Sequence, residues 1–187
     1  KISTFQPADR SIRPANRPLI EPPMTMARRA LVFAFLLVFS VIGPASAQDL
    51  IVGVASVIDG DTIEIHDHRI RLFGIDAPES SQLCVRTTGE RWRCGQQASF
   101  ALADRIGRAP VSCQPRDLDR YGRVVAVCFK GNEDLNRWMV ASGWAVAYKQ
   151  YSLDYVADEV GARRSRINIW SGEFEMPRDW RLQHRHR

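Results

Sequence analysis

Short runs of β-branched and other apolar residues, alternating with polar ones, recur along the chain beyond residue 48. Five such runs are present: 50–57, 62–65, 69–73, 111–113 and 124–129. Turn-forming residues separate them, since Asp59-Gly60 follows the first run and Asp119-Arg120-Tyr121-Gly122 lies between the last two. The pattern predicts short strands joined by tight turns.

Helical spacing is found in three segments: 89–107, 135–142 and 152–167. In the first, Ala98, Leu102 and Ile106 recur at four-residue intervals and share one face, and Gly107 suits the end of a helix. Ser152 is placed to cap the last helix. Strands that come first, with helices interspersed and appended, predict a mainly β fold with α: a small barrel of about five strands with helices packed outside.

The segment before residue 48 has the composition of a targeting sequence. Residues 26–47 begin with Met-Ala-Arg-Arg, continue with an apolar run and end in Ala-Ser-Ala, the layout of a secretory signal peptide. A membrane anchor is the alternative, but the run is shorter than the ~20 residues that span a bilayer. We expect residues 1–25 to be an upstream segment, 48–176 to be the folded domain and 177–187 to be a polar, frayed tail.

Net charge gives no support to a polyanion partner. The sequence has 26 Lys and Arg against 21 Asp and Glu, a formal charge of +5. Six basic and two acidic residues lie before position 48, so 20 basic and 19 acidic residues remain in the rest of the chain. Nucleic-acid binding must therefore be argued from particular residues.

Four cysteines follow the expected signal peptide: Cys84, Cys94, Cys113 and Cys128. An even number behind an export signal, without a Cys-x-x-Cys pair, favours two disulfides over a zinc site. In an antiparallel hairpin centred on the 119–122 turn, Cys113 faces Cys128. Cys84 and Cys94 then close the loop before the first helix. Pro115 cannot donate to a strand ladder and can force a bulge that shifts this register.

Three polar clusters interrupt the strands: residues 59–62, 69–79 and 119–123. Taken singly, each has an ordinary explanation as a turn, a solvated strand face or a helix start. Together they contain the parts of a phosphodiesterase site. Asp61 and Asp76 are hard oxygen ligands that, with a backbone carbonyl and waters, suit calcium. Glu79 can orient or deprotonate an attacking water, and Arg71 and Arg123 offer forked donors that match phosphate oxygens.

These clusters resemble the motifs of the thermonuclease (staphylococcal or micrococcal nuclease-like) family, in the same order and at similar separations. The matching pieces are Asp-Gly-Asp-Thr at 59–62, Arg-Leu-Phe-Gly-Ile-Asp-Ala-Pro-Glu at 71–79, Asp-Arg-Tyr-Gly-Arg at 119–123 and Asn-Ile-Trp at 168–170. The resemblance implies a five-stranded OB-fold barrel with three helices. It also implies calcium-dependent cleavage of the 5′-O–P bond in DNA and RNA, which leaves 3′-phosphates.

The resemblance assigns roles by position. The residues that match the catalytic positions are Arg71, Glu79 and Arg123. Those that match the calcium ligands are Asp61, Asp76 and Ala77, the last through its backbone carbonyl. Those that match the surroundings of bound nucleotide are Arg120, Tyr121 and Tyr148, and ordinary packing is the alternative for the two tyrosines.

We therefore expect an exported, periplasmic or secreted, monomeric endonuclease that uses Ca²⁺ and in-line attack of water on DNA and RNA. Sequence preference should be weak, because clamping a phosphate reads no bases. We expect no stable membrane association after signal cleavage. The chief alternative is a catalytically inactive OB-fold nucleic-acid-binding module. Such a copy would be expected to lack at least one of five residues, and all five are present: Asp61, Arg71, Asp76, Glu79 and Arg123. A structural or envelope-interaction protein is a third class.

Overall fold

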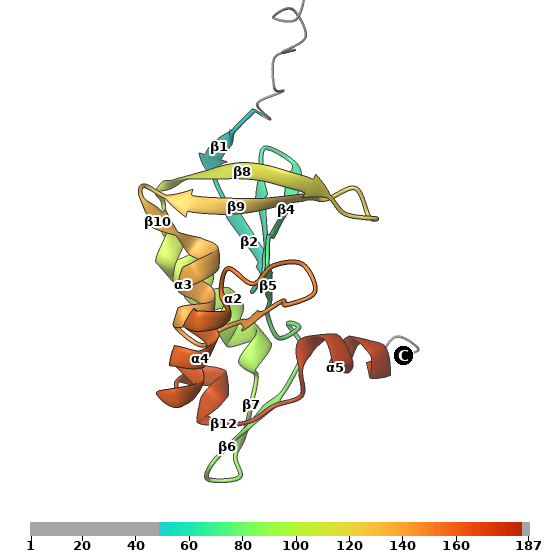
Figure 1. Ribbon diagram of the computed structural model, residues 1–187, viewed down its shortest axis with the longest axis vertical. Coiled ribbons are helices and arrows are strands. Elements are labelled where there is room, and N and C mark those ends of the chain that lie inside the picture. The colour runs from blue at the N-terminus through green and yellow to red at the C-terminus, as the bar shows by residue number, and fades with distance from the viewer. Residues whose placement is uncertain (1–48, 185–187) are drawn as a thin grey trace, which may run out of the picture. The chain divides into compact units, whose positions relative to one another are not determined.

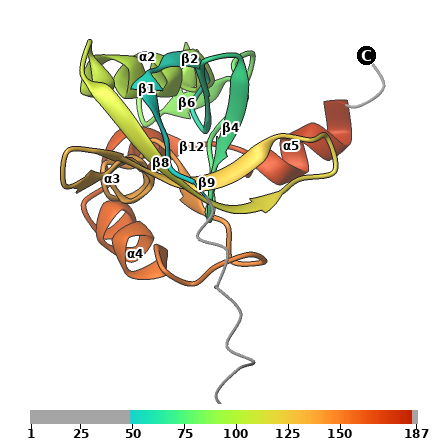
Figure 2. The same ribbon diagram turned by 90° about the horizontal axis from the view of Figure 1, so that it is seen from above.

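The computed structural model describes residues 49–184 (Figure 1). The expected upstream segment and signal peptide lie outside the described residues. The main sheet has the strand order β1-β8-β9-β4-β3-β2, and β10 also pairs with β9. Figures 1 and 2 show that this sheet is curled rather than flat. Its strands are β1 (Ile51–Val54), β2 (Ser56–Asp59), β3 (Thr62–Ile65), β4 (His68–Leu72), β8 (Pro110–Leu118), β9 (Val124–Lys130) and β10 (Glu133–Asp134).

One parallel pairing inside this sheet brings distant segments together. β4 and β9 run parallel, with Ile70 opposite Val124. The residue before β9 is Arg123. The pairing therefore places Arg123 beside the strand that carries Arg71, although 52 positions separate the two arginines in the sequence.

The hairpin of β8 and β9 has the register that the cysteine positions predict. Cys113 lies opposite Cys128, and the two form a disulfide with Cα atoms 4.0 Å apart. The anticipated bulge is present between Pro115 and Asp117. It does not disturb the cysteine pair, because it lies on the turn side of Cys113.

The first predicted helix is present but begins later than expected. Helix α2 (Cys94–Ile106) buries Ala98, Leu102 and Ile106, as their spacing predicts. Gly107 follows with a positive φ of 61°, a conformation that glycine adopts at little cost.

The predicted helical start at residue 89 is wrong, because residues 84–92 form a hairpin instead. Strands β6 (Cys84–Arg86) and β7 (Arg91–Trp92) pair antiparallel, and Gly89 in their turn has a φ of 84°. A second disulfide joins Cys84 to Cys94. It confirms the remaining predicted pairing and ties this hairpin to the start of α2.

The second predicted helix is confirmed as α3 (Leu135–Ala141), whereas the third is shorter than predicted. Helix α4 (Val156–Arg164) has Tyr155 at its N-cap position. The prediction that Ser152 caps this helix is wrong. Its hydroxyl accepts a hydrogen bond from the Asp154 N–H at 3.0 Å, so it stabilises a local turn before the helix begins.

The expectation of a frayed tail is also wrong. Residues 177–184 form a fourth α-helix of the described part, α5 (Pro177–His184), where the sequence suggested about three. Figure 1 shows α5 apart from α2, α3 and α4. No helix within residues 49–184 is long and apolar enough to cross a membrane. The remaining elements are β5 (Ile75–Asp76), β11 (Val146–Ala147), η1 (Asn168–Ser171) and β12 (Gly172–Glu173).

The core lies between the curled sheet and helices α2 and α3, with one buried amide at its edge. The Asn136 side chain of α3 is fully buried. It accepts a hydrogen bond from the Cys128 N–H at 3.0 Å and donates to the carbonyls of Phe73 and Ala126 at 2.9 and 3.1 Å. Because buried polar groups need such partners, Asn136 fixes the turn after β4 against β9 and α3.

Candidate active site

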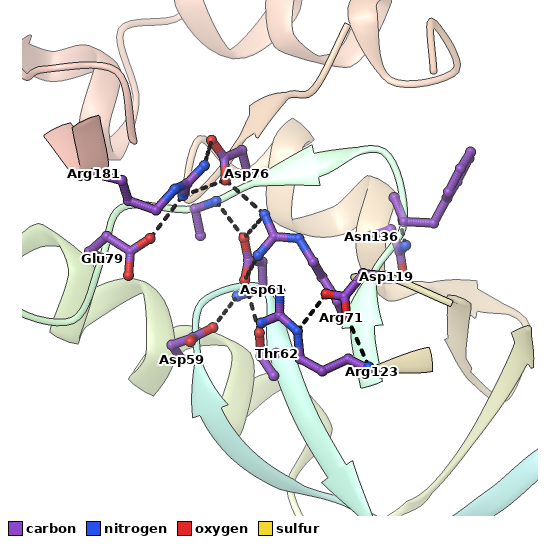
Figure 3. Close-up of polar contacts among 12 residues, drawn as sticks. Asp59, Asp61, Thr62, Arg71, Asp76, Glu79, Asp119, Arg123, Asn136 and Arg181 are labelled. Carbon is purple, nitrogen blue, oxygen red and sulfur yellow. Dashed lines mark hydrogen bonds and ion pairs between the residues drawn. The ribbon is translucent and has the colours of Figure 1, made fainter. Parts of the chain in front are cut away.

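Three side chains from separate elements converge at one end of β4 (Figure 3). Asp61 lies in the turn before β3, Arg71 on β4 and Asp76 on β5. Arg71 Nη1 donates to Asp61 Oδ1 at 3.1 Å, and Nη2 lies 2.9 Å from both Asp61 Oδ2 and Asp76 Oδ1. Arg71 therefore makes a two-point contact with the Asp61 carboxylate and a single contact with the Asp76 carboxylate.

Both carboxylates are almost fully removed from solvent. Asp61 is 4% exposed and Asp76 is 1% exposed. Burial raises the pKa of Asp76, and the hydrogen bond from Arg181 opposes that shift. Buried carboxylates of this kind require compensating cations or hydrogen-bond donors. The peptide N–H of Ala77 supplies one of these donors, 3.2 Å from Asp61 Oδ2.

A further carboxylate borders this pair. Asp59 Oδ1 accepts a hydrogen bond from the Asp61 N–H at 3.1 Å. Burial and then the charge of Asp61 raise the pKa of Asp59 to about 7. Asp59 is therefore a further acidic group of the site, whereas the sequence predicted only that it forms part of a turn.

Glu79 is held in place through its main chain. The buried Gln82 side chain accepts from the Glu79 N–H at 3.2 Å, and the Gln82 N–H donates to the Glu79 carbonyl at 2.7 Å. That carbonyl also packs against Gly95 in the first turn of α2, where an added Cβ would lie 1.7 Å from it. The Glu79 carboxylate itself is 32% exposed. Its backbone is fixed, while its side chain is only partly open to solvent.

Arg123 approaches from the β8–β9 turn. Its Nε donates to Asp119 Oδ2 at 2.7 Å, and its N–H donates to Asp119 Oδ1 at 3.0 Å. Burial disfavours the charge on Asp119, but the hydrogen bonds from Arg123 outweigh this and lower the pKa of Asp119. In Figure 3 the Arg123 side chain points toward the pair of Asp61 and Arg71.

The structure adds one residue that the sequence reasoning missed. Arg181, on α5, reaches both Asp76 and Glu79 (Figure 3). Pro177 at the first helical position and Asp179 in the first turn are signals of a helix start that were available in the sequence. They predict a helix but not where it packs, so they could not have located Arg181.

The proposed nucleotide-contacting residues divide into two places. Arg120 and Tyr121 lie in the same turn as Arg123. There the Arg120 guanidinium stacks 4.8 Å from the centre of the Tyr121 ring, which is 69% exposed. Tyr148 follows β11 and packs against Tyr151, with ring centres 4.9 Å apart. Its N–H donates to the Gly74 carbonyl at 2.8 Å, next to β5.

The oxygens of Asp61 and Asp76 are the donors that a calcium ion could use at this site. Among residues 49–184, no group of three or more His, Cys, Asp or Glu side chains is arranged to hold a metal. The oxygens of Asp61 and Asp76 instead face guanidinium groups. The chemistry of the donors nevertheless fits, because two buried carboxylates next to a peptide carbonyl are hard oxygen ligands that concentrate negative charge at one point.

The comparisons with known proteins agree with this geometry. The family model described as "Staphylococcal nuclease homologue" matches residues 69–172. The matched range contains Arg71, Asp76, Glu79 and Arg123 but begins after Asp61. The chain belongs to this family.

Three curated relatives illustrate the family relation. The succinoglycan biosynthesis protein ExoI of Rhizobium meliloti (strain 1021) is 39% identical over 134 residues, which cover 70% of each chain. A micrococcal nuclease of Shigella flexneri is 35% identical over 173 residues, covering 83% of this chain and 92% of that protein. An uncharacterized endonuclease of Haemophilus influenzae is 32% identical over 164 residues, covering 83% and 86%.

Proposed function

We propose that the protein is an exported, calcium-dependent endonuclease that hydrolyses phosphodiester bonds in DNA and RNA. The observation that carries this proposal is the convergence of Asp61, Arg71 and Asp76 with Glu79 and Arg123 at one end of the sheet. Two relatives, a micrococcal nuclease and an uncharacterized endonuclease, support a nuclease activity. The two disulfides support export to an oxidising compartment.

The half-buried carboxylate of Glu79 is the proposed general base. It takes a proton from the attacking water, whose oxygen forms the new bond to phosphorus. The bond from phosphorus to the 5′-oxygen breaks, and the departing 5′-oxygen takes a proton from solvent water and leaves as a hydroxyl. The phosphate remains on the 3′ side. The backbone bonds of Glu79 to Gln82, and its packing on Gly95, hold the base in one position.

Arg71 and Arg123 are the proposed phosphate clamp. A guanidinium presents donors in a planar fork that matches two phosphate oxygens. Negative charge grows on these oxygens as water attacks, so donors fixed in advance stabilise the transition state more than the ground state. The ion pair with Asp119, 2.7 Å from Arg123 Nε, orients this side chain before substrate binds.

Asp61, Asp76 and the Ala77 carbonyl are the proposed calcium ligands. When bound, calcium would supply positive charge to the phosphate and a position for the attacking water. These residues place two buried carboxylates beside Arg71. Arg120 and Tyr121, exposed in the neighbouring turn, are positioned to contact a nucleotide without reading its sequence.

The dependence on cations tests the proposal. The purified protein is incubated with plasmid DNA and with RNA in calcium, in magnesium and in chelator. We expect cleavage of both substrates in calcium, weak cleavage in magnesium because that ion holds its waters tightly and demands a stricter octahedron, and none in chelator. Full activity in chelator, or an equal response to magnesium, would contradict the assignment of calcium. Absence of cleavage under every condition would contradict a nuclease.

A further inference from the structure

Arg181 makes a two-point contact with one proposed calcium ligand and a third contact with the proposed base. Its Nη1 donates to Asp76 Oδ1 and Glu79 Oε1, both at 2.8 Å, and its Nη2 donates to Asp76 Oδ2 at 2.9 Å. Both oxygens of Asp76 are therefore engaged by the same guanidinium. Although burial disfavours the charge on Arg181, the hydrogen bonds from its side chain to these carboxylates raise its pKa.

The rest of α5 is weakly attached. In the part of the chain that the structure describes, the side-chain hydrogen bonds and ion pairs between α5 and other elements all come from Arg181. The segment that precedes α5 is held firmly, because β12 pairs with β6 and Gln82 Nε2 donates to the Glu175 carbonyl at 2.6 Å. Loss of the Arg181 contacts would therefore loosen α5 beyond its buried first residue, Pro177, and leave the chain up to residue 175 in place.

The charges explain why a cation is needed at this position. The carboxylates that Arg71 and Arg181 contact, Asp61, Asp76 and Glu79, together bring three negative charges, and Arg71 supplies one positive charge. Arg181 supplies a second. A divalent cation held by Asp76 would meet the same need from the same oxygens. Arg71 contacts Oδ1 of Asp76 alone, whereas Arg181 engages both Oδ1 and Oδ2, so a metal ion must take its place on Asp76 from Arg181. The two cations therefore compete for Asp76.

We propose that Arg181 is a further residue of the site: an intramolecular cation that occupies Asp76 and Glu79 until calcium displaces it. This inference rests on the proposed function, because it takes calcium as the displacing ion. Displacement would also free the Glu79 carboxylate to act as a base. Helix α5 would thus hold the nuclease inactive at low calcium, and binding of the metal would release the base.

The size of the effect follows from the fraction of molecules in which the contact is closed. If nine molecules in ten are closed, only one in ten is competent to bind, and the apparent affinity for calcium is about tenfold weaker than that of the open site. Arg181→Ala abolishes the closed state. It should therefore bind calcium about tenfold more tightly than the wild type.

Calcium binding by the full chain, measured by titration calorimetry without nucleic acid, tests this inference. The wild type is compared with Arg181→Ala and with Arg178→Ala. Arg178 is exposed on the same helix, so its removal changes the net charge equally without touching the carboxylates. We expect the tenfold gain for Arg181→Ala alone. A third variant, Arg181→Lys, keeps the charge but loses the fork, and should show part of the gain.

Hydrogen exchange of residues 177–184 gives a second readout, which does not depend on affinity. Saturating calcium should increase exchange in this segment of the wild type, because α5 loses its attachment. Equal calcium affinities of the wild type and Arg181→Ala, an equal gain for Arg178→Ala, or unchanged exchange in α5 would each overturn the competition while calcium binding itself stands. If neither wild type nor Arg181→Ala binds calcium, the calcium assignment and the competition both fail.

Discussion

Gly95 offers a test of how the fold positions the catalytic base. A Cβ added to this residue would lie 1.7 Å from the Glu79 carbonyl oxygen and 2.4 Å from its carbonyl carbon. Real Cβ atoms keep at least about 3.0 Å from such atoms, so Gly95→Ala must push the oxygen and the new methyl about 1.3 Å further apart. Backbone rather than a flexible side chain stands in the way. The displacement must therefore move the loop that carries Glu79 or the start of α2.

We expect Gly95→Ala to lower kcat even though alanine favours the helical conformation. Misplacing a catalytic group by about 1 Å can reduce the rate about 100-fold, and we expect a loss of kcat of that order for Gly95→Ala. Alanine is otherwise the better helix former by about 1 kcal/mol. Gly161, exposed on α4 with nothing within 4 Å of an added Cβ, is the matched control. Gly161→Ala should be as active as the wild type and should melt at the same or a higher temperature.

The assay is calcium-dependent cleavage of DNA under saturating substrate, with thermal unfolding measured on the same samples. A Gly95→Ala protein that remains folded, as judged by a cooperative transition, and has lost kcat supports the account. A folded Gly95→Ala protein with the kcat of the wild type would show that the close packing of Glu79 on α2 does not position the base. The reasoning from geometry to rate would then be refuted.

Two further predictions concern the arginines. Arg71→Lys keeps the charge but loses the fork, so it should cost roughly 3 kcal/mol of transition-state stabilisation. Arg69→Lys, on the same strand with a side chain 66% exposed, should leave the kinetics unchanged, and equal effects of the two would argue against the clamp. The hydrogen bonds from Arg123 lower the folded-state pKa of Asp119. The ion pair therefore contributes its full stabilisation above the unfolded-state pKa of about 4, and this stabilisation is lost as the pH falls through the folded-state pKa. Denaturant unfolding should therefore show Asp119→Asn less stable than the wild type by about 1 kcal/mol at neutral pH. The difference should shrink as the pH falls through the folded-state pKa of Asp119 and vanish once the carboxyl is protonated in both states. A difference independent of pH would mean that the charge is not responsible.

Local signals carried much of the fold prediction because they report on neighbouring residues. The alternation of apolar residues located the main strands, and the positions of Cys113 and Cys128 correctly predicted the register of β8 and β9. Contacts between distant segments left no such mark. The start of α2 was misplaced because the disulfide of Cys84 and Cys94 and the turn at Gly89 favour a hairpin there.

In the candidate site, too, the residues of sequence motifs were predicted and a contact made by tertiary packing was not. The residues of the matching motifs lie together because the parallel pairing of β4 with β9 joins two of the clusters. Arg181 could not have been placed, since nothing in residues 177–184 indicates that this helix returns to β5. Its contacts with Asp76 and Glu79 are a consequence of tertiary packing alone.

The most direct test of the central claim is the turnover of Glu79→Gln. Glutamine keeps the shape of the side chain but cannot accept the proton of the attacking water. In saturating calcium, the wild type should cleave DNA to products that end in 3′-phosphate, and a Glu79→Gln protein that unfolds at the same temperature should be at least about 100-fold slower. A Glu79→Gln protein with a near-normal rate and the same products would show that Glu79 is not the base, and would contradict the proposed mechanism at its centre.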